Sequence, residues 1–479
     1  MLPIVLIHGY SSEGSSNTAE TIYGTLPSEL RSHFGAEVLD INLSRWISLS
    51  DGIALDDVSF AMERALQSQS AKLADGFHVI IHSTGALVVR NWIKLYSPKP
   101  CPIHNLVHLA GANFGSGLAH IGRGQMARWA RFFKGTGRGV RVLDELEFGS
   151  SKTIDLHAHF IDAGNDMYHD YQVQEFCLIG SQTLSSMRHI PIRYVKEDSS
   201  DNTVRTSAGN LNYNFLRVAP VDSAYSISIN KLKNLISQRK SDELLDTSSI
   251  YQFDLSDVAS ERQAVPYFIA YETAHFGEDI GIVTGSDNRK EIVPLVKQAL
   301  ATEYDEDAYA ATAESFETAR QQTFKRAAKL RWSALEWNKQ SQYEGHAQLI
   351  FRLKDQFGTE ISDFDITIKS TPPGTRKNKL EHMIEDKHLN KKNKGTITFY
   401  LRTQKFNKRS KKWTELLDRV PTVHLEITAH EDKSDDIEFA PLSIKLTPTN
   451  IRALIQTFRT TIVDVTLLRL PSPKVFSLK

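Results

Sequence analysis

Cysteine is scarce in this sequence, because Cys101 and Cys177 are the only two among 479 residues. That scarcity excludes a disulfide-rich scaffold, and we expect both cysteines to be buried free thiols. Lys plus Arg and Asp plus Glu each count 57, so no excess charge draws the chain to nucleic acid, and no nucleic-acid partner is expected. A run of apolar residues long enough to cross a membrane is also missing.

The start of the chain shows no leader pattern. Residues 1–9 read MLPIVLIHG, without a basic beginning and without a small-residue cleavage site. We therefore expect a cytoplasmic protein, and export by a machinery that needs no leader stays open.

The first 300 residues do contain a regular alternation of β-branched runs and helical segments. Leu55–Leu66 and Gly85–Leu95 have the apolar spacing of helices. Continuous apolar strands that alternate with helices predict an α/β fold, with a mainly parallel sheet covered on both faces. The expected strands are Ile4–Ile7, Glu37–Asn42, His78–His82, Leu106–Leu109, Phe176–Ile179 and Pro266–Tyr271.

Composition separates residues 1–300, predicted to form one domain, from the remainder of the chain. Within that domain, residues 115–172 contain no good strand and are predicted to form an inserted helical lid or cap. Residues 301–342 are charged and rich in alanine, which predicts a helical linker. Residues 343–479 alternate apolar and polar side chains in several segments, which predicts a C-terminal all-β, sandwich-like domain.

The strongest indication of chemistry is a serine placed between a strand and a helix. The apolar run ending at His82 leads directly into Ser83, and the helix begins at Gly85. Such a sharp turn exposes a hydroxyl above the sheet edge and aims the N-terminal helix dipole at developing negative charge. Gly85 fills the second glycine of the G-x-S-x-G motif, whereas Ile81 replaces the first. A serine that merely caps a buried helix is the alternative interpretation.

A second indication lies one strand earlier, where the apolar run ending at Ile7 is followed by His-Gly-Tyr and a loop rich in Ser and Gly. In a hydrolase of this arrangement, that loop donates one backbone N–H to an oxyanion. The residue after the nucleophile donates the other. We therefore predict an oxyanion hole built from the amides of Tyr10 and Thr84.

An acid and a histidine must follow the serine in that order. Asp201 lies in a polar turn after the strand Phe176–Ile179, and we predict it as the acid, with Asp198 as its competitor. His275 lies in a loop between the last strand and the final helix, and we predict it as the base. His82, next to the serine, points away from it by strand alternation and is interpreted as a packing residue.

Ser83, Asp201 and His275 together predict a serine hydrolase. The histidine removes the serine proton during attack on a carbonyl carbon, and the aspartate orients the histidine ring and stabilises its cation. This chemistry needs no cofactor, and no cluster of Cys and His ligands suggests a metal.

Three motifs together resemble bacterial lipases and esterases of the α/β-hydrolase superfamily. They are IHSTG around Ser83, LAGANFGS at residues 109–116, and DNTV at residues 201–204. The nearest group contains the triacylglycerol lipases and the lecithin–cholesterol acyltransferases, in which a Gly-Ser pair follows this strand, as Gly115 and Ser116 do here. The resemblance covers about residues 1–300. It implies hydrolysis of carboxylic esters, with lipids as the favoured substrates, and a lipase or phospholipase is the leading interpretation.

The lid segment is basic and aromatic, with no acid between Ser116 and Leu143. A basic amphipathic helix of this kind fits peripheral contact with an anionic membrane, and a cap helix with solvated cations is the alternative. The cations are Arg123, Arg128, Arg131, Lys134, Arg138 and Arg141.

Two alternatives to a lipase or phospholipase stay open. The first is an acyltransferase that uses the same three residues. The second is a lipase toxin directed at membranes, whose β domain docks a protein partner such as a delivery apparatus or an immunity protein.

Overall fold

The chain folds into two units, each described separately. The first unit comprises Met1–Asn212, Glu261–Glu344 and Phe406–Lys412, and the second comprises Tyr213–Ser260, Gly345–Lys405 and Trp413–Lys479. The computed structural model describes residues 1–7, 22–41, 43, 52–116, 140–182, 198–227, 231, 234, 246–253, 262–277, 279–285, 289–330, 339–370, 379–431 and 436–471.

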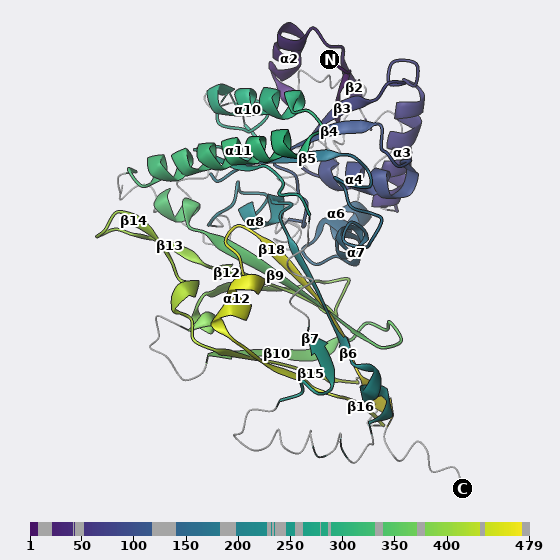
Figure 1. Ribbon diagram of the computed structural model, residues 1–479, viewed down its shortest axis with the longest axis vertical. Coiled ribbons are helices and arrows are strands. Elements are labelled where there is room, and N and C mark those ends of the chain that lie inside the picture. The colour runs from purple at the N-terminus through teal and green to yellow at the C-terminus, as the bar shows by residue number, and fades with distance from the viewer. Residues whose placement is uncertain are drawn as a thin grey trace. The chain divides into compact units, whose positions relative to one another are not determined.

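A fully parallel, six-stranded sheet forms the centre of the first unit (Figure 1). In order across the sheet, its strands are β2 (Val38–Ile41), β1 (Ile4–Ile7), β3 (Phe77–His82), β4 (Ile103–Leu109), β5 (Gln174–Gly180) and β8 (Tyr267–Ala270). Every residue of β1, β3, β5 and β8 is buried. Strands that are covered on both faces form continuous apolar runs, which is why the sequence predicts these four; β2 and β4, each with an exposed residue, are predicted as well.

Helices cover both faces of this sheet, as the alternation of strands and helices predicts. One face carries α3 (Leu55–Gln67) and α4 (Gly85–Tyr96), and the other carries α2 (Leu26–Phe34), α10 (Arg289–Ala301) and α11 (Glu306–Ala327). Alternate side chains of the central strands point into these two cores.

Helix α11 lies within the segment predicted to be a linker. Its Tyr309 and Phe316 are buried in the core that also contains residues of β1 and β5. The Tyr309 hydroxyl donates a 2.7 Å hydrogen bond to the carbonyl of Glu175. The helix begins after Asp305, whose carboxylate accepts from the amide of Ala308 at 2.9 Å. This segment is therefore a packed part of the first unit.

A buried ion pair ties α4 to the sheet. Arg90 of α4 contacts Glu175 of β5, and the Glu175 carboxylate is 3.2 Å from Nε2 of His108 on β4. All three residues are at most 4% exposed. Burial alone would raise the pKa of Glu175, but the charge of Arg90 and the contact with His108 outweigh it and lower that pKa to about 2. The carboxylate therefore stays charged inside the core.

The second unit contains two sheets and a short helix. The larger sheet has the order β11 (Ile384–Leu389), β12 (Thr396–Arg402), β9 (His346–Asp355), β18 (Thr460–Leu467), β6 (Asn214–Pro220) and β7 (Tyr251–Phe253). The smaller, antiparallel sheet has the order β10 (Asp363–Ser370), β15 (Val423–His430) and β17 (Leu442–Leu446). Helix α12 (Pro448–Leu454) follows β17, and two ribbons pair β13 (Gln404–Asn407) with β14 (Lys412–Glu415) and β16 (Ile437–Phe439) with β19 (Arg469–Pro471).

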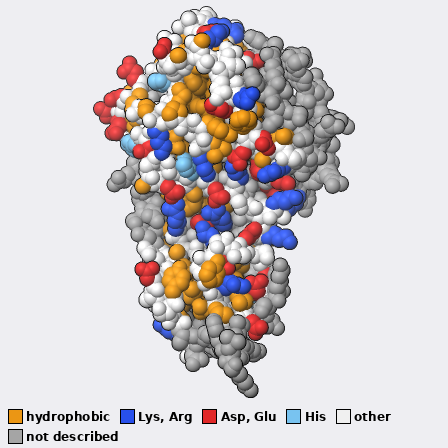
Figure 2. Space-filling view, turned by 90° about the vertical axis from the view of Figure 1, so that its right-hand side faces the viewer, with side chains coloured by type: hydrophobic (Ala, Val, Ile, Leu, Met, Phe, Trp, Pro, Cys, Tyr) orange, Lys and Arg blue, Asp and Glu red, His pale blue; other side chains and the backbone are white. Residues whose placement is uncertain are grey.

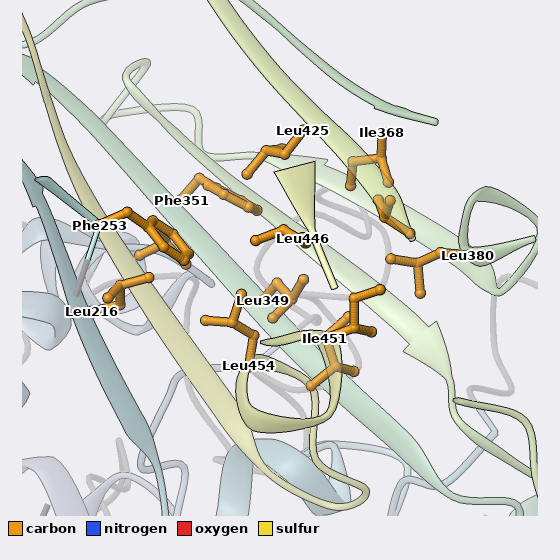
Figure 3. Close-up of a pocket in the computed structure, with 13 residues that line it drawn as sticks. Leu216, Phe253, Leu349, Phe351, Ile368, Leu380, Leu425, Leu446, Ile451 and Leu454 are labelled. Atoms are coloured by element: carbon orange, nitrogen blue, oxygen red, sulfur yellow. The ribbon is translucent and has the colours of Figure 1, made fainter. Parts of the chain in front are cut away.

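Both sheets of the second unit bury side chains in one apolar core. Leu349 and Phe351 of β9 belong to the same cluster as Leu425 and Ile427 of β15, which is the packing of a sandwich. A small cavity remains in this core, and its lining is entirely apolar (Figure 3). Residues around it include Leu216, Phe253, Leu349, Leu425, Leu446 and Ile451.

The division into units differs from the predicted domains in two strand-bearing segments, because Phe406–Lys412 is assigned to the first unit and Tyr213–Ser260 to the second. Tyr213–Ser260 falls in the second unit, because its strand β6 runs parallel to β18. Asn214 and Thr461 are partners in this pairing although they lie 247 residues apart. A local sequence pattern carries no information about a partner so distant.

Several expectations from composition have counterparts in the structure. Cys101 and Cys177 are both buried and free. One face of the molecule carries Lys and Arg side chains interspersed with Asp and Glu, in keeping with their equal counts (Figure 2). In the part of the chain that the structure describes, no helix is both long and apolar enough to span a bilayer.

We predict that Glu175→Gln lowers the free energy of unfolding by about 3–5 kcal/mol, because it removes the counter-charge of a buried guanidinium. Urea unfolding measures the effect. Glu37→Gln is the control, because Glu37 pairs with Lys72 at the surface and its loss should cost less than about 1 kcal/mol. Equal losses in the two variants would contradict the role of the buried pair.

The same variant should also change the acid sensitivity. Glu175 keeps its charge down to a pKa of about 2 in the folded state, against 4.5 for an ordinary glutamate. The unfolded chain therefore takes up this proton first, and the stabilising effect is lost as the pH falls from about 4.5 to about 2. Glu175→Gln should lose stability less steeply than the parent over this range.

Candidate active site

Ser83 occupies a strained turn between β3 and α4. Its backbone has a φ of 56°, in the left-handed region that non-glycine residues rarely adopt. Hydrogen bonds hold the turn: the Ser83 amide donates to the carbonyl of Leu109 at 3.2 Å, and the Ser83 carbonyl accepts from the amide of Ala112 at 3.1 Å. This conformation matches the expected turn, in which the hydroxyl is presented at the C-terminal edge of the sheet.

His275 follows β8 and lies beside the serine. Its Nε2 is 3.0 Å from Ser83 Oγ, and its Nδ1 is 2.8 Å from Oδ2 of Asp201. A carboxylate oxygen only accepts, so Nδ1 carries the ring proton and Nε2 is left to accept from the hydroxyl. Ser83, His275 and Asp201 are at most 3% exposed. The structure therefore brings the three predicted residues into one hydrogen-bonded chain.

Asp201 is oriented by its own turn. Its Oδ1 accepts from the amides of Thr203 at 3.0 Å and Val204 at 2.7 Å, which leaves Oδ2 for the histidine. The competitor Asp198 has other partners, because its Oδ1 accepts from Ser341 Oγ at 2.8 Å and from the Gln342 side chain at 3.1 Å. The geometry therefore favours Asp201 over Asp198 as the partner of the histidine.

The Gly-Ser pair after β4 fastens the loop that carries the acid. Ser116 Oγ donates to the carbonyl of Thr203, two residues beyond Asp201. Gly115 has a φ of 88°, and a Cβ at this position would lie 2.6 Å from the carbonyl oxygen of Leu146. The pair that carries part of the sequence resemblance thus has a physical role, since only glycine fits the turn that delivers this serine.

Of the two predicted oxyanion donors, Thr84 can be located. Its amide is at the N-terminus of α4, where backbone N–H groups have no partner within the helix. Tyr10 lies outside the described residues. The strand that leads to it is anchored by Tyr23, whose hydroxyl donates to the carbonyl of Ile7 at 2.7 Å. Burial raises the pKa of Tyr23 well above its usual value, so this donor keeps its proton.

The predicted lid is described only in its second half. Two short helices, α6 (Val140–Leu146) and α7 (Ser151–His159), lie there. The Ser150 side chain caps α7 by accepting from the amide of Thr153 at 3.1 Å. Residues 117–139, with five of the six predicted cations, lie outside the described ranges, and Arg141 is the one that is described.

One position at the site differs from its sequence interpretation. Strand alternation predicts that His82 points away from the serine and packs in the core. Instead, its Nε2 lies 3.1 Å from the carbonyl oxygen of His275, and the two ring centroids are 4.7 Å apart. The contact comes from a loop 193 residues further along the chain, so the alternation of side chains along β3 could not indicate it.

Sequence reasoning also missed residues that hold the loop of the base. Gly180, at the end of β5, has no room for a side chain, since a Cβ would lie 2.8 Å from the carbonyl carbon of Thr273 and 3.2 Å from Cβ of Asp201. The Tyr343 hydroxyl accepts from the amide of Glu272, near the start of the same loop, at 2.9 Å. The place of Gly180 at the end of a buried strand could have indicated a close approach of another segment. Nothing near Tyr343 in the sequence indicates that it holds the loop of the base.

The parallel sheet, the strained serine turn and the order of acid and histidine define the α/β-hydrolase fold predicted from the resemblance. A family model for palmitoyl protein thioesterases matches residues 3–137. No curated protein matches the chain in sequence.

Among solved structures, the chain is similar to phospholipase PlaB from Legionella pneumophila. The TM-score is 0.77 at 23% identity, over 100% of this chain and 96% of that chain. For PlaB in complex with thio-NAD the TM-score is 0.76 at 21% identity, with the same coverage. The mature lipase BlEst2 from Bacillus licheniformis gives 0.32 at 16% identity, over 44% of this chain and 79% of that chain. The likeness to PlaB spans both units and confirms the fold, including the additional β-sheets of the C-terminal part.

We predict that Gly180→Ala lowers the turnover of an ester substrate by about tenfold or more, because the new methyl group must displace the loop carrying His275 by a sizeable fraction of an ångström. Gly52→Ala is the control, since a Cβ there has no neighbour within 4 Å. Steady-state kinetics on purified variants measures the effect. Equal turnover in the two alanine variants would show that the close approach at Gly180 does not matter for the site.

Proposed function

We propose that this protein is a serine hydrolase that cleaves acyl esters of lipids, as a lipase or phospholipase. The observation that carries the proposal is the continuous hydrogen-bond chain from Ser83 Oγ through the His275 ring to the Asp201 carboxylate. Near-complete burial strengthens the electrostatic part of this chain, because little water competes for the donors and acceptors.

In the proposed reaction, Ser83 Oγ attacks the carbonyl carbon of the ester and His275 Nε2 takes the hydroxyl proton. Asp201 stabilises the imidazolium that forms. The tetrahedral intermediate then collapses, and its leaving alcohol takes the proton from His275. Water attacks the acyl-enzyme in the same way, which releases the carboxylic acid and restores the serine.

The negative charge on the tetrahedral oxygen needs donors at the edge of the sheet. We assign this role to the amides of Thr84 and Tyr10. The position of Thr84 at the N-terminus of α4 supports the first assignment, because the helix dipole there favours an anion. Each such donor contributes roughly 2.7–4 kcal/mol to lowering the barrier.

The comparisons support acyl cleavage and a lipid substrate. The family model that matches residues 3–137 describes thioesterases, and the structural neighbour that spans the whole chain is described as a phospholipase. A thioesterase transfers an acyl group to water through a carbonyl addition step, and a phospholipase acts on a lipid substrate. Acyl transfer to another alcohol, a role as a membrane-directed toxin, a protein partner of the second unit, and the cytoplasmic location all stay predictions.

We predict that Ser83→Ala abolishes hydrolysis of a soluble short-chain chromogenic ester and that Asp201→Asn lowers kcat by about 10⁴-fold. Asp198→Asn is the matched control. It changes the same kind of side chain three residues away, and because Asp198 contacts Ser341 and Gln342 rather than the histidine, it should leave kcat within a few-fold. Full residual activity in Ser83→Ala would refute the assignment of the nucleophile.

The sequence of the basic lid segment supports a further part of the proposal, that this segment binds the surface of an anionic membrane. Replacing Arg128 and Arg131 with glutamine should weaken binding to vesicles containing anionic lipid, because each cation near such a surface contributes about 1 kcal/mol. Hydrolysis of a soluble ester should not change. Co-sedimentation with vesicles measures the binding, and equal binding by variant and parent would count against this contact.

A further inference from the structure

We propose that His82, the residue before the nucleophile, is a positioning residue that holds the backbone of His275 in place. This inference rests on the proposed function, because it assigns a role relative to the proposed catalytic base. It gives a role to a residue that belongs to the motif around Ser83 but has no part in the triad.

The contact between the two histidines has a definite direction. His82 Nε2 is 3.1 Å from the carbonyl oxygen of His275. A carbonyl oxygen only accepts, so Nε2 of His82 carries a hydrogen and donates it. The rings also lie against each other, with centroids 4.7 Å apart and planes inclined at 39°. His82 is 8% exposed and His275 is 3% exposed, so this hydrogen bond forms where little water competes.

The main chain of His275 is also held on its amide side, by the loop of the acid. The amide of His275 donates to the carbonyl of Asp201 at 3.1 Å, and its carbonyl accepts from His82. The main chain of the base is thus fixed by the loop of the acid on one side and by strand β3 on the other. The imidazole ring is fixed separately through its contact with the Asp201 carboxylate.

The hydrogen bond from His82 affects the distance between the nucleophile and the base, because His82 directly precedes Ser83. Ser83 Oγ and His275 Nε2 come from elements 192 residues apart, and their separation of 3.0 Å must be maintained for proton transfer. His82 is the last residue of β3, and its hydrogen bond links this strand, directly before Ser83, to the loop of His275. A shift of that loop by about 1 Å is enough to lower the rate by about 10²-fold.

A matched residue lies on the same strand. His78 precedes His82 by four residues, so the period of two places both on one face of β3. His78 is 6% exposed, close to the value for His82, but its ring lies near His104, at 6.1 Å between centroids, at the other end of the strand. Removing either histidine takes a buried imidazole from the same strand, and only His82 contacts the proposed base.

The experiment measures kcat and KM of the full-length protein on a soluble short-chain chromogenic ester. Three variants of His82 are compared: glutamine keeps a donor at similar reach, asparagine carries the same amide one methylene shorter, and leucine removes the donor. His78→Leu is the packing control. Circular dichroism and thermal unfolding verify that each variant is folded, and Ser83→Ala is assayed on the same ester.

We expect His82→Leu and His82→Asn to lower kcat by about ten- to a hundredfold with KM within a few-fold. His82→Gln should recover kcat to within a few-fold of the parent, and His78→Leu should match the parent. If the leucine variant does not fold, the glutamine and asparagine variants decide the question. The proposal is overturned if asparagine or leucine leaves kcat within about twofold, or if glutamine is no better than asparagine. Activity retained in Ser83→Ala would instead refute the proposed function itself.

Discussion

One imidazole held between a hydroxyl and a carboxylate is the interaction on which the proposed chemistry depends. His275 lies 3.0 Å from Ser83 Oγ and 2.8 Å from Asp201 Oδ2, and its partners come from loops that follow β3 and β5 in the chain. Because all strands of the first sheet are parallel, their C-terminal ends meet at one edge, and residues distant in sequence converge there. The parallel order of the strands is therefore what allows these three side chains to act together.

Close contacts hold the loops that carry these three side chains in position. Ser116 fastens the acid loop from one side, and Gly180 allows the base loop to pass within van der Waals distance of β5. Tyr343 holds the start of the base loop, and His82 contacts the base itself. Beneath them, the ion pair between Glu175 and the helix after the nucleophile holds that helix to the sheet. These contacts hold the elements from which the three proposed catalytic residues project.

The sequence predicted much of the first unit, because buried parallel strands form unbroken apolar runs that a local pattern can reveal. It also placed Ser83, Asp201 and His275 at loop positions from which the structure brings them together. The features it could not predict depend on contacts between distant segments. The pairing of β6 with a strand near the C-terminus left no local trace, and the contact of His82 with the main chain of His275 joins residues 193 positions apart.

The most direct test of the central claim is the site and rate of covalent labelling by a serine-reactive fluorophosphonate, mapped by mass spectrometry of peptides. If His275 activates the hydroxyl, the adduct lies on Ser83 in the parent, and His275→Gln slows its formation by about 10²-fold or more. An adduct on a different serine, or equal labelling rates at Ser83 with and without the imidazole, would contradict the account.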